Sequence, residues 1–278
     1  MIKINIVLIL VAVTLIQIAV YSQSKIVYGS NKGKYIKISG KNVYYEEYGR
    51  GVPLLLLEGG MKTIADFSKC IPKLSKHFRV IAPDDPGQGR SEMQDTMTYA
   101  LLADYASRFI DELKLDSVYV MGWSDGGIAA LILAAKRPDK VKKVIASGAN
   151  YMKSGLISSD SSKDTLQLIP SDYKLGPEEQ KEVDKIFILN KTSWTKIYND
   201  RAVMWFQEYY FPESLLGDIK IPVMIVSGDR DVIKLEHSIK MYRLIKGSQL
   251  YILPNTTHDV FNDSPELINE VAIKFFTK

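Results

Sequence analysis

The chain has 278 residues, of which 46% are hydrophobic and 24% charged, so it has an ordinary globular composition and can bury one large core. Its 36 lysines and arginines exceed its 32 aspartates and glutamates, and the formal net charge is +4. The basic residues are spread along the chain rather than gathered in one block, which argues against nucleic acid as the main partner.

The first residues predict an export signal. Lys3 stands near the start, an apolar run extends from Ile4 to Val20, and the small Ser22 follows at a position suited to cleavage. We therefore expect residues 1–22 to be a signal peptide and the mature protein to be exported, either periplasmic or secreted. The alternative is an uncleaved anchor, because the apolar run approaches the roughly 17 residues that a spanning helix needs. Only such an anchor would bring the protein to a membrane.

After the leader, residues 35–38 and 42–49 have β-type composition around a turn and predict an antiparallel hairpin. From there, short apolar segments alternate with segments of helical periodicity. This alternation is typical of a parallel sheet that helices cover on both faces. The expected strands are 54–57, 79–84, 117–122, 144–149, 221–228 and 249–254, and the expected helices are 64–76, 98–113, 126–136, 234–246 and a closing helix capped by Ser264.

The alternation breaks at about residue 150 and resumes some seventy residues later. We expect a core formed by residues 34–150 and 218–278, with residues 151–217 inserted as a helical lid. The insertion is rich in aromatic residues, which could line a substrate pocket, form the small core of the lid, or do both. These residues are Trp194, Tyr198, Trp205, Phe206, Tyr209 and Tyr210.

The hexapeptide GWSDGG, residues 122–127, stands where an apolar strand is expected to end and a buried helix to begin. In this context the pattern Gly-x-Ser-x-Gly predicts a sharp turn that projects Ser124. A Cβ at Gly122 or Gly126 would collide with the neighbouring backbone of such a turn. The turn also directs the amide of Asp125 at negative charge that develops beside Ser124. Ser124 is therefore the candidate nucleophile, and the Asp125 amide is a candidate oxyanion-hole donor.

A serine nucleophile needs a general base and a group that orients that base. Of the three histidines, His258 follows the last expected strand in a polar loop, at the edge where ligands and chemistry gather in open α/β sheets. His77 and His237 are expected to be structural or solvated. The preceding strand ends at SGDRD, so Asp229 and Asp231 are both candidates for the acid. Either one gives the chain order of serine, acid and histidine.

These segments carry a family resemblance. GWSDGGIAALILAAKRPDKVKKVIASGAN and KGSQLYILPNTTHD resemble α/β-hydrolases of the biphenyl hydrolase-like (valacyclovir hydrolase-like) group, and a looser likeness extends from about residue 34 to the end. The resemblance implies an α/β-hydrolase fold, with a mostly parallel eight-stranded sheet, helices on both faces and a helical lid. It also implies that the acid stands three residues beyond the glycine after the penultimate strand, which selects Asp231.

The likeness is incomplete in the loop after the expected strand 54–57. Many members of the group carry His-Gly there, whereas this chain has Glu58-Gly59-Gly60-Met61. Because the oxyanion-hole donor in this loop is a backbone amide, the changed side chain at Glu58 need not abolish it. Gly60 is the candidate donor and Met61 is the alternative. The group's Asp-x-x-Gly-x-Gly-x-Ser loop is present at residues 84–91, and we interpret it as a turn that shapes the fold.

Asp125 stands directly beside the candidate nucleophile, and its side chain has two interpretations. In the first, it only interacts favourably with the dipole of the helix that it begins, which contributes about 0.3 to 1 kcal/mol. In the second, which the resemblance implies, its carboxylate binds the α-amine of an aminoacyl ester. We favour the second, because charges beside a reaction centre usually have a use.

We predict a serine hydrolase that cleaves a carboxylic ester or amide, with α-aminoacyl esters among the candidates. Ser124 forms the acyl-enzyme, His258 transfers the proton and Asp231 orients the imidazole. The expected partner is a small-molecule ester or amide, and no metal or organic cofactor is needed, because no His/Cys cluster or phosphate-binding glycine loop is found. The alternatives are a carboxylesterase, lactonase or C–C bond hydrolase acting on a neutral or anionic molecule, and a non-catalytic binder of a small molecule or protein.

Overall fold

The computed structural model describes residues 26–29, 31, 33–157 and 166–278. The expected signal peptide, residues 1–22, lies outside these residues, so export stays a prediction. Across the described ranges, no helix has both the length and the apolar character that a membrane span requires.

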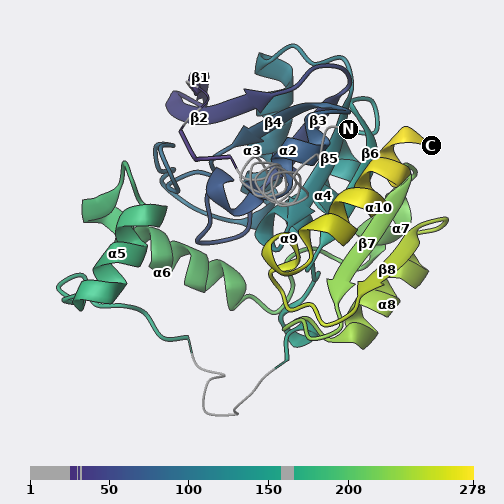
Figure 1. Ribbon diagram of the computed structural model, residues 1–278. Coiled ribbons are helices and arrows are strands. Elements are labelled where there is room, and N and C mark those ends of the chain that lie inside the picture. The colour runs from purple at the N-terminus through teal and green to yellow at the C-terminus, as the bar shows by residue number, and fades with distance from the viewer. Residues whose placement is uncertain (1–25, 30, 32, 158–165) are drawn as a thin grey trace, which may run out of the picture.

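The chain forms one eight-stranded sheet (Figure 1). Its strands are β1 (Lys34–Ile38), β2 (Lys41–Tyr48), β3 (Pro53–Leu57), β4 (Arg79–Pro83), β5 (Val118–Trp123), β6 (Val141–Ser147), β7 (Val223–Gly228) and β8 (Gln249–Leu253). They lie in the order β1-β2-β4-β3-β5-β6-β7-β8. β1 and β2 form the expected hairpin, β2 is also antiparallel to β4, and every other neighbouring pair is parallel. The mostly parallel sheet that the sequence predicts is therefore confirmed.

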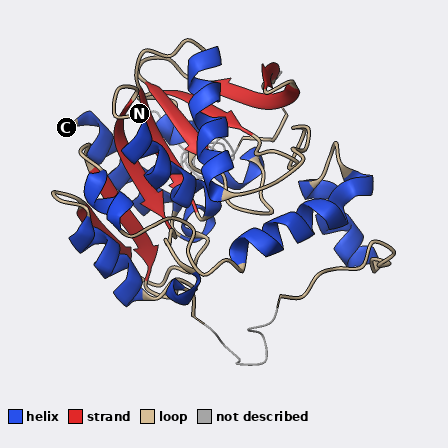
Figure 2. Ribbon diagram, turned by 180° about the vertical axis from the view of Figure 1, so that it is seen from behind, coloured by secondary structure: helices blue, strands red, loops and turns tan. Residues whose placement is uncertain are grey.

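Alternate residues of the central strands pack on opposite faces of the sheet. Along β3, Leu55 and Leu57 belong to one hydrophobic cluster, whereas Leu54 and Leu56 belong to another. This period of two is the geometry of an extended strand, and it explains why a strand buried on both faces is apolar at every position. Figure 2 shows that helices cover both faces.

Each face has its own set of helices. The first cluster packs α3 (Tyr99–Glu112), α4 (Asp125–Lys136), α7 (Ser214–Asp218) and α8 (Leu235–Leu244) against the sheet. The second packs η1 (Ile64–Phe67), α2 (Ile71–Leu74), α9 (Val260–Asp263) and α10 (Pro265–Thr277). α4 is buried from Asp125 to Ala134, as its nearly uninterrupted apolar sequence predicts.

Two expected elements differ in detail. The single helix expected over residues 64–76 is instead the 3₁₀ turn η1 followed by the short helix α2. Pro72 in this segment has no amide hydrogen and its ring opposes a continuous helix through this position. The closing helix begins after Ser264 as expected, but the Ser264 hydroxyl contacts the Thr256 hydroxyl at 2.6 Å and caps no helix amide.

The segment between β6 and β7, residues 148–222, is called the insertion below. It contains η2 (Lys153–Gly155), α5 (Pro177–Ile186), η4 (Lys191–Ser193), α6 (Trp194–Trp205) and α7. In Figure 1, α5 and α6 extend away from the sheet on one side. Val183, Phe187 and Ile197 form a small hydrophobic cluster of their own there, with Trp194 packed against it. The insertion therefore has a local core in addition to its contacts with the sheet.

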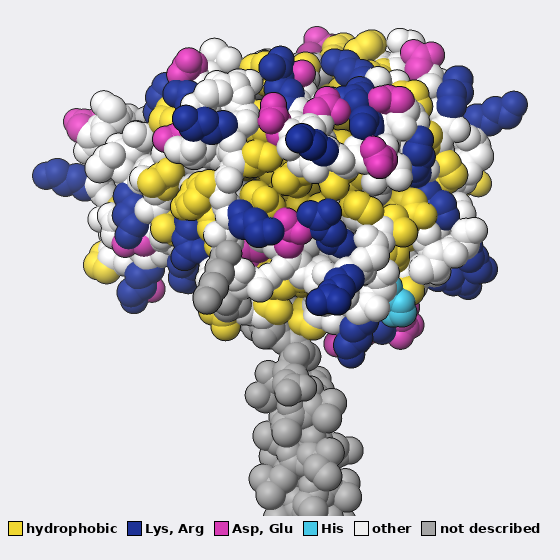
Figure 3. All heavy atoms as spheres, turned by 90° about the horizontal axis from the view of Figure 1, so that it is seen from above, with side chains coloured by type: hydrophobic (Ala, Val, Ile, Leu, Met, Phe, Trp, Pro, Cys, Tyr) yellow, Lys and Arg dark blue, Asp and Glu magenta, His cyan; other side chains and the backbone are white. Residues whose placement is uncertain are grey.

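On the face of the molecule that Figure 3 shows, basic and acidic side chains are interspersed among hydrophobic and neutral ones. Neither sign forms a continuous block on this face. The surface charges on this side are thus mixed, as they are along the chain.

Candidate active site

Ser124 occupies the sharp turn between β5 and α4. Its backbone has φ 54° and ψ −117°, a combination that is strained for a residue with a side chain. The flanking glycines let the chain close on itself at this turn. A Cβ on Gly122 would collide with the carbonyl oxygen of Gly126, and a Cβ on Gly126 would collide with that of Leu57. Both positions need glycine, as the sequence predicts.

His258 and Asp231 contact each other at the carboxyl edge of the sheet. His258 Nδ1 lies 2.7 Å from Asp231 Oδ1. The Asp231 carboxylate is buried and also accepts hydrogen bonds from the Ile233 amide at 3.0 Å and the Ser227 hydroxyl at 3.2 Å. These neutral donors fix the orientation of the carboxylate without cancelling its charge. The structure therefore places Asp231 where the orienting acid is expected.

The loop that carries His258 is fixed from several sides. The other candidate acid, Asp229, accepts a hydrogen bond from the Thr256 amide at 3.0 Å and so braces this loop. The Trp123 indole donates to the His258 carbonyl oxygen at 2.8 Å. A Cβ on Gly148, which has φ +58°, would lie only 2.7 Å from His258 Cε1. Gly148, which sequence analysis did not identify, thus leaves the space that the imidazole fills.

Ser124 and His258 line the same cavity, whose volume is about 820 Å³. This volume is within the roughly 300–1,000 Å³ of typical small-molecule sites. Much of the wall is apolar and comes from the insertion and from the loop after β7. The apolar residues include Leu156, Ile157, Phe206, Tyr210, Val232 and Ile233. The cavity can hold a largely apolar small molecule against Ser124.

The aromatic residues of the insertion divide between the two expected roles. Trp205, Phe206 and Tyr210 line the cavity. The others do not: Trp194 packs in the small cluster of the insertion, Tyr198 contacts the Trp205 ring edge-on at 6.2 Å, and Tyr209 is exposed. The aromatic residues thus serve both as a cavity wall and as a local core.

The loop after β3 lies against Ser124. A Cβ on Gly59 would be 3.2 Å from the Ser124 Cβ, and a Cβ on Gly60 would be 2.6 Å from Trp205 Cζ2. The Met61 amide donates to the Gln88 side chain. The Gly60 amide has no hydrogen-bond partner within residues 33–157 and 166–278. This arrangement favours Gly60 over Met61 as the oxyanion donor beside the Asp125 amide, and the assignment stays a prediction.

Comparison with known proteins identifies the fold. A family model described as alpha/beta hydrolase fold matches residues 52–170. The chain has the alpha/beta hydrolase fold. It is 26% identical to human Serine hydrolase BPHL over 254 residues, which cover 86% of this chain and 84% of that protein.

Other similar proteins come from bacteria. The 2-hydroxy-6-oxo-2,4-heptadienoate hydrolase of Pseudomonas putida is 25% identical, over 81% of this chain and 89% of that protein. The structure of the enol-lactonase from Burkholderia xenovorans matches with a TM-score of 0.70 at 18% identity. The match covers 88% of this chain and 100% of that chain. The latter likeness concerns the fold alone.

Asp125, at the start of α4, is only 2% exposed, and both of its carboxylate oxygens accept hydrogen bonds. Oδ1 accepts from the Tyr99 hydroxyl at 2.9 Å and from Trp205 Nε1 at 3.0 Å. Oδ2 accepts from Arg201 Nη1 at 3.0 Å. Binding of a substrate amine by Asp125 stays a prediction. The Arg201 guanidinium already occupies the place beside the carboxylate that the substrate ammonium group would take.

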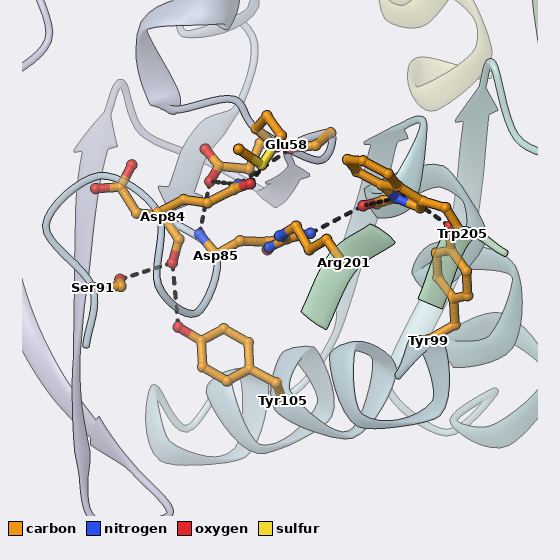
Figure 4. A network of polar contacts seen from close by, with 12 residues as sticks. Glu58, Asp84, Asp85, Ser91, Tyr99, Tyr105, Arg201 and Trp205 are labelled. Atoms are coloured by element: carbon orange, nitrogen blue, oxygen red, sulfur yellow. Dashed lines mark hydrogen bonds and ion pairs between the residues drawn. The ribbon is translucent and has the colours of Figure 1, made fainter. Parts of the chain in front are cut away.

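Arg201 is completely buried on α6, close to Asp85 and Trp205 (Figure 4), and it contacts two aspartates. Its second contact is with Asp85, from Nη2 to Oδ2 at 3.4 Å. Burial lowers the pKa of Arg201, but the charges of Asp85 and Asp125 raise it, and the net change is upward. The guanidinium therefore stays charged. Arg201 was not predicted from the sequence, because a single arginine on a helix of mixed composition is usually a solvated side chain.

A second group of buried carboxyls lies behind the loop after β3. Burial raises the pKa of Asp84 to about 7 and that of Asp85 to about 6. Burial, and then Asp84 and Asp85, raise the pKa of Glu58 well above its usual range. Glu58 Oε1 accepts from the Asp85 amide at 2.8 Å and from Gln88 Nε2 at 2.7 Å. Residues 84–91 thus brace the loop after β3, in line with a turn that shapes the fold.

Proposed function

We propose that this protein is a serine hydrolase that cleaves carboxylic esters of small molecules through an acyl-enzyme. One observation carries the proposal: His258, whose Nδ1 lies 2.7 Å from Asp231 Oδ1, lines the same cavity as Ser124. A serine at a strained turn, an imidazole and a buried carboxylate are together the set of groups that acyl transfer to serine requires.

In the proposed mechanism, Ser124 Oγ attacks the ester carbonyl carbon while His258 Nε2 accepts the hydroxyl proton. Because Asp231 accepts a hydrogen bond from Nδ1–H, the imidazole presents its basic Nε2 to the reaction. The amides of Gly60 and Asp125 stabilise the oxyanion, and each such donor contributes on the order of 3 kcal/mol to the transition state. His258 then donates its proton to the leaving alkoxide, and later activates the water that releases the acyl group.

A second candidate is the hydrolysis of an anionic carbonyl compound or a lactone. Lys153 and Lys234 line the cavity, and ammonium groups suit a substrate carboxylate. The relative from P. putida is named as a hydrolase of a dienoate, and the structural neighbour from B. xenovorans as an enol-lactonase. The ester reaction remains the main proposal, because the apolar walls suit an uncharged acyl group.

The proposal is tested with a fluorophosphonate probe and a panel of p-nitrophenyl esters, lactones and dienoates. We expect the probe to label the wild-type protein at Ser124, and we expect Ser124→Ala to lose both labelling and ester turnover. Turnover of dienoates or lactones, without turnover of simple esters, would support the second candidate. A wild-type protein that resists labelling over a broad pH range would exclude the serine mechanism.

A further inference from the structure

We propose that Arg201 is the permanent counter-ion of Asp125 and compensates the negative charge of this carboxylate in the cavity beside Ser124. The cavity therefore selects acyl groups that carry no positive charge. This inference deepens the ester hydrolase proposed above and rests on it. Arg201 does not line the cavity that contains Ser124, so it is a positioning and specificity residue that acts through Asp125.

The first support is the position of Asp125. Its side chain follows the nucleophile directly in the chain, and it lines the cavity together with Ser124. An isolated carboxylate here would attract a substrate ammonium group and repel the oxyanion that forms during attack. A bare Asp125 would thus impair the reaction of neutral esters and improve the binding of aminoacyl esters.

The second support is that the hydrogen-bonding positions of this carboxylate are occupied. Arg201 Nη1 lies 3.0 Å from Oδ2, and Trp205 Nε1 lies 3.0 Å from Oδ1 and 3.1 Å from Oδ2. Tyr99 donates the remaining hydrogen bond to Oδ1. A substrate ammonium group would therefore have to displace a charged partner that has no exposed surface and is held from its other end by Asp85.

A purely structural ion pair is the competing explanation, because Arg201 also joins α6 of the insertion to the start of α4 and to the loop after β4. Such a pair would influence stability without changing which acyl groups react. The two explanations therefore differ in one measurable quantity: the ratio of kcat/KM for a cationic ester to kcat/KM for its uncharged twin. A p-nitrophenyl aminoacyl ester and its N-acetylated form provide this pair.

In the wild-type protein we expect the N-acetylated ester to react with the higher kcat/KM. In Arg201→Met, whose side chain is long and uncharged, the ratio shifts toward the free amine by about tenfold or more, since Asp125 then pairs with the substrate. In Asp125→Asn/Arg201→Met the ratio returns toward the wild-type value, because both charges are gone. Lys196→Met is the matched control: it removes an exposed cation of α6 that pairs with Asp200 and does not line the cavity, and it leaves the ratio unchanged.

Asp125→Asn alone keeps the test decisive if Arg201→Met does not fold. It leaves Arg201 partly uncompensated, so the ratio shifts further away from the free amine. An unchanged ratio in both single variants would overturn the proposal and leave only a structural pair. A wild-type preference for the free amine that disappears in Asp125→Asn would also overturn it. If Ser124 is not labelled and no ester reacts, the proposed function fails as well, whereas labelling with unchanged ratios removes this inference alone.

Discussion

Asp231 and Asp125 are both buried aspartates at the carboxyl edge of the sheet, yet their partners differ. Asp231 contacts the imidazole of His258, whose side chain is 25% exposed. Asp125 contacts the guanidinium of Arg201, which has no exposed surface. An imidazole can both accept and donate a proton through its ring nitrogens, whereas a guanidinium only donates hydrogen bonds and keeps its charge in proteins. The first pair can therefore transfer a proton, and the second can only fix a charge.

The remaining partners of the two carboxylates reinforce this difference. The amide and hydroxyl that donate to Asp231 are neutral, so its negative charge is available to stabilise an imidazolium. Asp125 receives neutral donors as well, from Tyr99 and Trp205, but its charge is compensated by a full cation. The role of a buried carboxylate thus depends less on its position in the chain than on the partner that the fold brings to it.

The largest effect is expected from Asp231→Asn. An asparagine at 231 can donate to Nδ1 and so favour the wrong imidazole tautomer, and we expect kcat for a p-nitrophenyl ester to fall on the order of 10⁴-fold. Asp229→Asn is the matched control, because Asp229 braces the loop and does not contact the imidazole. Its kcat should stay close to that of wild type. If Asp231→Asn retained a large part of the wild-type rate, Asp231 would not orient the base.

Gly148→Ala tests whether the contact between His258 and Asp231 depends on the position of the imidazole ring. The new Cβ would lie 2.7 Å from His258 Cε1 and 2.9 Å from Nδ1, so the ring has to move away from its position beside Asp231. Displacement of a catalytic group by about 1 Å costs on the order of 10²-fold, which is the loss expected in kcat/KM.

Gly247→Ala is the matched control for this substitution. Gly247 has φ +78°, and a Cβ there meets nothing within 4 Å, so the variant imposes backbone strain without a collision. It should lose stability by about 1 kcal/mol and keep its kcat/KM. Equal kinetic losses in the two variants would mean that strain, and not the space beside His258, explains the effect of Gly148→Ala.

Local patterns in the sequence were sufficient for most of the fold. The period of two along β3 and the apolar sequence of α4 reflect the burial of these elements on both sides, so they could be found without a structure. The prediction of a single helix over residues 64–76 was wrong. Pro72 lacks an amide hydrogen and disfavours a continuous helix there, although the surrounding residues have apolar periodicity.

The candidate site was only partly predictable. Ser124 stands in a local motif, and the family resemblance selected Asp231. The pairing of Arg201 with Asp125 joins residues that are 76 positions apart and depends on how α6 packs near the start of α4, which no local pattern encodes. The negative charge of Asp125 beside the nucleophile could therefore be predicted from the sequence, but its pairing with the positive charge of Arg201 could not.

A third buried carboxyl, Glu58, extends the comparison to a group that forms no ion pair within the described residues. Its Oε2 is buried and has no hydrogen-bond partner in the described part of the chain. Burial, with Asp84 and Asp85 nearby, raises the pKa of Glu58 in the folded protein. The folded state therefore holds this proton more tightly than the unfolded chain. The resulting stability is complete below the unfolded pKa of about 4.3 and is lost as the pH rises toward the folded pKa.

Glu58→Gln removes this titration while keeping an acceptor oxygen for the Asp85 amide and Gln88. We expect the variant to exceed wild type in free energy of unfolding by about 1–3 kcal/mol at pH 8, with a smaller difference at pH 5, as measured by urea denaturation. We expect Glu47→Gln to change the free energy of unfolding in the opposite direction. Burial alone would raise the pKa of Glu47, but its bonds with Arg79 and Lys34 lower it, so removing this paired charge should destabilise the protein at pH 8. If Glu58→Gln were instead less stable than wild type at pH 8, a charged Glu58 would have a stabilising partner. The hypothesis that Glu58 is buried without a compensating charge would then be wrong.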